Sequence, residues 1–198
     1  MIGVASASGS KQAILVAGVA GLVAGAMSMA AGEYVSVSSQ RDAEDADIER
    51  EKWELAERPR TELRELASNY VRRGLDKELA LKVAEQLTAR DRLAAHLKDE
   101  LGIEGATRAR PLQAAWISAL SFASFALVPI GAMLAVPAAW RIPAIAISSL
   151  VSLGVLGAVG SHLGGAPLAR GAFRVVLGGG VAMAVTAGIG RLLGVSVS

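Results

Sequence analysis

Two pairs of glutamates near the middle of the chain have spacings that could hold a metal cation. Glu51 and Glu54 are three residues apart, and so are Glu62 and Glu65. In a helix this spacing places both carboxylates of a pair on one face, and Pro59 predicts a bend that could bring the two pairs together. Clustered carboxylates repel one another unless cations lie between them, and their oxygens suit divalent ions such as Fe(II) and Mn(II). The alternative is a solvated, charge-rich helix face.

A further glutamate, Glu33, lies inside an apolar run over residues 12–37. About 20 apolar residues suffice to cross the hydrocarbon core of a bilayer, so this run is the first predicted span. Met29 precedes Glu33 by one turn, and Ser36 and Gln40 continue the same helix face. A charge inside a membrane is costly unless it is paired or hydrated. Glu33 is therefore either an interfacial carboxylate or a carrier of a cation or proton, and the neighbouring Met29 sulfur favours the carrier.

The charges of the chain are concentrated in one segment. Apolar residues make up 53% of the chain, its mean hydropathy is +0.45 and its net charge is +2. Every acidic residue except Glu33, and all but five of the 20 basic residues, lie between residues 41 and 110. Acids and bases alternate there, which does not point to nucleic acid. The chain has no cysteine, so thiolate metal ligands and disulfides are excluded.

The pattern predicts an all-α polytopic membrane protein with four transmembrane helices and a small helical subdomain inserted after the first. We divide the chain into residues 1–38, 39–110 and 111–198. The first helix should continue without a break to about Glu57. The later spans are expected over residues 112–136, 143–159 and 171–195. Glycines of the first span, including Gly21 and Gly25, are spaced for close helix packing.

The inserted segment should form three short helices after Pro59. Thr61 is expected to open the first, and Gly74 to end it. Asp76 should cap the second, whose apolar stripe would be Leu79, Val83 and Leu87, and the third should end at Gly102. The chain contains no E-x-x-H, H-E-x-x-H, P-loop or G-x-S-x-G motif. We therefore do not expect an enzyme.

The stretch GVAGLVAGAMSMAAGEYVSVSSQRD, residues 18–42, closely resembles the second membrane helix of the vacuolar iron transporter family. The resemblance continues through ELRELASNYVRRGL and DELGI to the last apolar spans. Members of that family have five membrane helices, and this chain begins near what looks like the end of the first. The intramembrane aspartate of the family's Asn-Asp-Gly motif therefore has no counterpart here.

The resemblance implies roles for particular residues. Those that would line the transport path are Met27, Met29 and Glu33. Those that match the family's cytoplasmic metal-binding glutamates are Glu51, Glu54, Glu62, Glu65 and Glu100. His96 stands where the family tends to have a methionine, one turn before Glu100. It is either a further, imidazole ligand or a solvated surface histidine.

The function implied by the resemblance is transport of Fe(II) or Mn(II) out of the cytoplasm by proton exchange, in a homodimer whose pore lies between the subunits. Zn(II) is a further candidate for the cytoplasmic site. Arg41, Arg108 and Arg110 flank the charged segment, which places residues 39–110 in the cytoplasm. The composition suggests a bacterial cell (inner) membrane. The alternative function is a non-transporting membrane metal-binding or sensor protein, derived by loss of the first helix.

Overall fold

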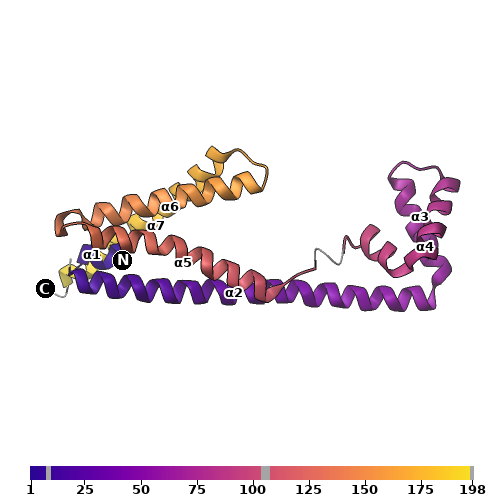
Figure 1. The fold of residues 1–198 in the computed structure, drawn as a ribbon, viewed down its shortest axis with the longest axis horizontal. Helices are drawn as coiled ribbons and strands as arrows, with labels where there is room; N and C mark the ends of the chain where they lie inside the picture. Colours follow the sequence, from indigo (N-terminus) through magenta and orange to yellow (C-terminus); the bar gives the residue numbers. More distant parts are fainter. Residues whose placement is uncertain (8–9, 104–107, 197–198) are drawn as a thin grey trace. The chain divides into compact units, whose positions relative to one another are not determined.

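The computed structural model describes residues 1–7, 10–103 and 108–196, and these are almost entirely helical (Figure 1). The described elements are α1 (Ile2–Ala7), α2 (Lys11–Glu57), α3 (Pro59–Arg72), α4 (Lys77–Asp99), α5 (Pro111–Ala135), the 3-10 turn η1 (Ala138–Trp140), α6 (Arg141–Leu163) and α7 (Leu168–Ser196). Helices α2, α5, α6 and α7 are long and apolar enough to cross a membrane. The predicted all-α polytopic architecture with four spans is confirmed.

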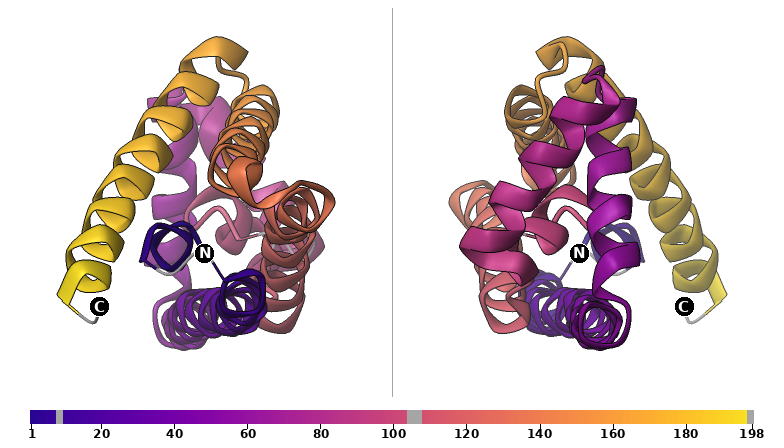
Figure 2. Two further views of the ribbon diagram at one scale, coloured as in Figure 1. Left: turned by 90° about the vertical axis from the view of Figure 1, so that its left-hand side faces the viewer. Right: turned by 90° about the vertical axis from the view of Figure 1, so that its right-hand side faces the viewer.

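The chain forms two compact units, which we call the apolar unit (residues 1–31 and 115–198) and the polar unit (residues 32–114). In the apolar unit, α6 and α7 pack side by side (Figure 1) and α1 packs against α7 (Figure 2). A small core of Ala5, Ile14, Met133 and Ile145 joins α1, α2, α5 and α6. Most other apolar side chains of these helices are exposed, as expected of surfaces that face lipid.

Helices α6 and α7 cross with their backbones in contact. A Cβ atom at Gly157 would lie 2.6 Å from the carbonyl oxygen of Gly171. A Cβ atom at Gly171 would in turn overlap the side chain of Ser161 and lie 2.5 Å from the carbonyl oxygen of Gly157. Small residues at such a crossing allow the close approach by which membrane helices pack. The crossing therefore depends on glycine at both positions.

The predicted glycine stripe of α2 is used only in part. A Cβ atom at Gly18 would meet Met1, and one at Gly25 would meet Phe122, whereas Gly21 and Gly32 face open space. The Gly21–Gly25 pair thus has one packed member within the described single chain.

In the polar unit, local signals set the helix ends. Helix α2 ends at Glu57 as predicted, and Pro59 takes a first-turn position of α3, where its missing N–H costs nothing. The predicted start at Thr61 was therefore two residues late. Gly74 adopts φ +104° after α3, and Asp76 then caps α4 by accepting hydrogen bonds from two backbone N–H groups at 3.0 Å.

Helix α4 has a kink at Asp91, where φ is −158° and ψ is 98°. The Asp91 carboxylate accepts a hydrogen bond from the Ala94 N–H at 3.0 Å, so it caps the second segment. The kink corresponds to the predicted boundary between two separate helices. It sets the direction of the segment that carries His96 and Glu100.

The core of the polar unit is small. Leu66 and Ala67 of α3 pack against Ala84 of α4, with Leu63, Tyr70 and Ala95 around them. The predicted stripe on α4 was partly wrong, because Leu79 is 49% exposed while Ala80 is fully buried. Alanine at this contact lets the two helices approach closely, and the larger side chain remains outside.

Candidate metal centre

Three helices bring four ligating side chains together at one point. Glu51 comes from α2, Glu62 from the first turn of α3, and His96 and Glu100 from the end of α4. One ligand atom from each residue lies within 4.8 Å of the others. We call these four residues the metal centre. The bend at Pro59 allows the first two helices to share it, as the sequence predicts.

The metal centre is buried and its polar atoms are unsatisfied. His96 is fully buried, and Glu51 and Glu62 are each 5% exposed. The His96 Nδ1 atom lies 3.0 Å from Glu51 Oε1 and 3.2 Å from Glu100 Oε1, yet none of these three atoms has a well-directed hydrogen bond among the described residues. One ring nitrogen can donate to only one of the two carboxylates. Buried polar atoms are rarely left in this state, and a cation between them would satisfy all three.

The other two predicted glutamates lie beside the centre. Glu54 and Glu65 line a cavity of about 300 Å³, which we call the carboxylate cavity. Its lining combines seven carboxylates with only two guanidinium groups; the charged members are Asp47, Arg50, Glu51, Glu54, Glu62, Glu65, Arg72, Asp99 and Glu100. Glu65 is exposed and Glu54 is half-buried. The cavity therefore concentrates negative charge around the buried ligands, which attracts cations.

Burial shifts the ionisation of the centre toward its protonated forms. Burial, together with the nearby charges of Glu65, Glu62 and Glu54, raises the pKa of Glu100 to about 7. Burial also raises the pKa of Glu51, an effect that His96 opposes, and burial with the charge of Glu65 raises the pKa of Glu62. Glu100 additionally caps the C-terminus of α4, where the helix dipole disfavours an anion. Without a cation, these carboxyls therefore take up a proton more readily than they would in water.

A second set of contacts fixes the end of α4, and sequence reasoning missed it. The Tyr70 hydroxyl of α3 donates a hydrogen bond to Asp99 Oδ2, and Arg73 Nη1 lies 3.0 Å from Asp99 Oδ1. Burial and this hydrogen bond raise the pKa of Tyr70 to about 12. Neither Tyr70 nor Asp99 was among the predicted site residues, and Asp99 carries no signal in the sequence apart from its position next to Glu100. The contacts anchor the turn that carries Glu100.

The chain direction changes sharply just after Glu100. Gly102 adopts φ +67°, and the Ile103 N–H donates a hydrogen bond to the Leu97 carbonyl at 2.8 Å. Glycine is favoured at such a turn because its φ is positive. The turn ends α4 directly beyond its last ligand.

The predicted transport-path residues all lie on α2, before Glu51 in the chain. Met27 is 67% exposed, Met29 is 45% exposed, and Glu33 is also exposed. Glu33 precedes Glu51 by 18 residues, which corresponds to about 27 Å of helix. Met27 and Met29 are two residues apart, so they lie on roughly opposite sides of α2.

Together these features define an all-α integral membrane protein with a buried, carboxylate-rich centre of the kind that binds divalent cations. The chain belongs to the VIT family, whose family model matches residues 1–191. It is 48% identical over 188 residues to a vacuolar iron transporter of Acanthamoeba castellanii, covering 94% of this chain and 72% of that protein. It is also 37% identical over 195 residues to vacuolar iron transporter homolog 1 of Oryza sativa, covering 98% of this chain and 66% of the relative. A VIT-like transporter 1b of Glycine max is 34% identical over 198 residues, covering 99% of this chain and 69% of that protein.

Proposed function

We propose that this protein binds Fe(II) or Mn(II) at the metal centre and moves the ion across the membrane, out of the cytoplasm. The observation that carries the proposal is the convergence of Glu51, Glu100 and His96, three buried groups whose polar atoms need a cation. The relatives of this chain include vacuolar iron transporters, which supports iron as the cargo.

The ligand set favours a divalent ion that is intermediate between hard and soft metal ions. Carboxylate oxygens suit hard cations, and the imidazole of His96 suits Fe(II), Zn(II) and related metals. The centre offers three carboxylates and one imidazole, a combination that Fe(II), Mn(II) and Zn(II) can all accept. Glu54 and Glu65 would hold a second cation or guide the first to the centre, because they line the same cavity.

Transport would then proceed along α2 past Glu33, Met29 and Met27. Glu33 would bind either the metal or a proton but not both at once. Exchange of metal for protons requires such mutually exclusive binding. These side chains are exposed in the single chain, so a second copy of the protein would be needed to enclose a path, which supports a homodimer. We further propose that residues 39–110 form the cytoplasmic metal-binding part and that the host membrane is a bacterial inner membrane.

The test is titration of the purified full chain in detergent with Mn(II), followed by calorimetry. Glu62→Gln and His96→Ala should each weaken binding by about 100-fold or more, since loss of even an outer partner of a metal ligand typically costs 10–100-fold. Glu57→Gln is the matched control, because Glu57 is an exposed glutamate at the end of α2, outside the carboxylate cavity. Unchanged Mn(II) binding in both centre variants would show that the cluster is a solvated acidic face.

A further inference from the structure

Acidic and polar side chains follow one face of α2 from the metal centre toward Glu33. Their positions differ by three or four residues throughout; they are Met29, Glu33, Ser36, Gln40, Glu44, Asp47, Glu51 and Glu54. At about 100° per residue, all eight fall within an arc of about 80° around the helix axis. We call this row the α2 stripe.

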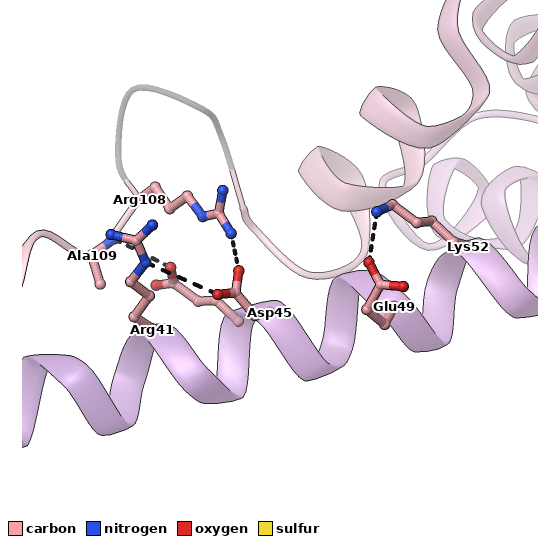
Figure 3. A network of polar contacts seen from close by, with 7 residues as sticks. Arg41, Asp45, Glu49, Lys52, Arg108 and Ala109 are labelled. Atoms are coloured by element: carbon pink, nitrogen blue, oxygen red, sulfur yellow. Dashed lines mark hydrogen bonds and ion pairs between the residues drawn. The ribbon is translucent and has the colours of Figure 1, made fainter.

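The remaining acids of this part of α2 lie on the opposite side of the helix and are used differently. Asp45 pairs with Arg41 and Arg108, and Glu49 lies 2.6 Å from Lys52 (Figure 3). These pairs are exposed and join neighbouring turns of α2 to one another and to the chain that returns toward α5. They explain the charges of that face without any ligand.

Asp47 connects the α2 stripe to the metal centre. It lines the carboxylate cavity together with Glu51, whose buried Oε1 has no hydrogen bond within the part of the chain that the structure describes. That unsatisfied oxygen points to a cation in this cavity independently of the number of acids around it. Asp47 lies 3.2 Å from Arg50, whose side chain is 64% exposed. An exposed pair of this kind is weak, so a divalent ion can replace the guanidinium.

Glu44 lies one turn further along and is held in place by neutral donors. Its Oε1 accepts a hydrogen bond from Gln40 Nε2 at 3.2 Å, and its Oε2 accepts one from the Ala109 N–H at 3.2 Å. Both donors are amides, so these two bonds orient the carboxylate through neutral groups. An oriented carboxylate can receive a cation with little further loss of side-chain freedom.

Distance explains why intermediate carboxylates are needed. Glu51 and Glu33 are separated by about 27 Å of helix, too far for a cation bound at one to feel the other through water, where the screening length is about 8 Å. Asp47 lies about 6 Å along the axis from Glu51, and Glu44 about 4.5 Å beyond it. These two steps are each shorter than the screening length. Between Glu44 and Glu33, about 16.5 Å of helix, the stripe continues through the neutral side chains of Gln40 and Ser36.

We propose that Asp47 and Glu44 pass the divalent cation from the metal centre along α2 toward Glu33. This relay rests on the proposed transport function and names the residues that would receive the ion first after the metal centre. Asp47 and Glu44 would act as transient ligands of the moving ion, whereas the metal centre would be its place of capture.

The test compares Mn(II) uptake by the full chain in proteoliposomes with Mn(II) binding in detergent. Asp47→Asn and Glu44→Gln should each slow the initial uptake rate by roughly tenfold, the factor by which a carboxylate about 5 Å away concentrates a divalent cation even in water. Asp47→Glu should keep the rate. The control variants Asp42→Asn and Glu49→Gln remove a charge of the opposite face and should transport normally. Calorimetry should show an unchanged number of Mn(II) ions bound at the metal centre in Glu44→Gln and in the two control variants, because these three residues lie outside the carboxylate cavity.

Wild-type uptake rates in both Asp47→Asn and Glu44→Gln would overturn the relay while leaving the transport function intact. An equal loss of uptake rate in the two control variants would also overturn the relay, because the loss would then come from the general negative charge of the surface. If the wild-type chain gives no uptake above empty vesicles, the proposed function fails and the relay fails with it.

Discussion

We expect Glu100 to set the pH range in which the metal centre can hold a cation. Burial and neighbouring carboxylates raise its pKa to about 7, so a proton must leave before a metal can bind at lower pH. The affinity for Mn(II) should therefore rise by about one logarithmic unit per pH unit below pH 7 and level off above it. Calorimetry between about pH 5.5 and 8, in two buffers of different ionisation enthalpy, would measure both the affinity and the proton released. An affinity independent of pH would exclude Glu100 as a ligand.

The same shifts determine the stability of the polar unit without metal. The folded state holds protons on Glu51, Glu62 and Glu100 more tightly than the unfolded state does, because all three pKa values are raised. In a chelator, the melting temperature should therefore fall as pH rises from 4.5 through about 7. Added Mn(II) should reverse the fall at pH 8. A chelated protein that became more stable over this range would contradict the assigned ionisation.

Tyr70 acts on the centre through Asp99. Tyr70→Phe removes the hydroxyl that anchors Asp99, and loss of such a bond typically costs about 1 kcal/mol. We expect a modest, roughly tenfold loss of Mn(II) affinity with an unchanged number of ions bound, because the ligands remain and only their placement loosens. Tyr34→Phe, at an exposed position on α2, is the control. An affinity equal to wild type in Tyr70→Phe would show that Asp99 does not position Glu100.

Among the helices, the crossing of α6 and α7 offers the sharpest test of packing. Gly171→Ala places a methyl group into the Ser161 side chain and the Gly157 carbonyl, and overpacking of this kind typically costs about 1–3 kcal/mol. Gly178→Ala on the same helix is the matched control, because a Cβ atom there meets nothing within 4 Å. Thermal unfolding in detergent should show a lower melting temperature only for Gly171→Ala. Equal melting temperatures would mean that the helices do not cross at this point.

Helix ends could be predicted from the sequence because each is set by a local signal. Pro59, Gly74 and Asp76 act within a few residues of their own position, and the structure places helix boundaries beside all three. The four membrane spans could be predicted equally well, because length and hydropathy define them. The buried face of α4 could not be predicted in this way. Whether Leu79 or Ala80 is buried depends on how closely α3 approaches α4.

The metal centre could be predicted only in part. The spacing of the glutamate pairs and the bend at Pro59 indicate that α2 and α3 share a site, but His96 and Glu100 entered through resemblance. Their burial depends on the kink at Asp91, which aims the end of α4. The bond between Tyr70 and Asp99 joins residues 29 positions apart, and no local pattern indicates such a contact.

For the whole molecule, the arrangement of spans predicts a topology. If all four helices span the membrane, the polar unit and the C-terminus lie on opposite sides of it. Basic residues favour the cytoplasmic side, and the polar unit is flanked by Arg41, Arg108 and Arg110, so we expect the polar unit in the cytoplasm. A reporter fused after Ser198 should therefore behave as non-cytoplasmic, and one inserted after Gly74 as cytoplasmic. Two reporters on the same side would mean that the number of spans in the membrane is not four.

The central claim is that this chain carries a divalent cation across a membrane through Glu33. The most direct measurement is uptake of Mn(II) into proteoliposomes that contain the full chain and an internal pH dye. Wild-type protein should take up Mn(II) and move protons in the opposite direction, whereas Glu33→Gln should do neither, although a neutral amide is tolerated in the membrane. Wild-type uptake in Glu33→Gln would make Glu33 an interfacial anchor. Absence of uptake by the wild-type chain would contradict transport itself and favour a membrane-bound metal sensor.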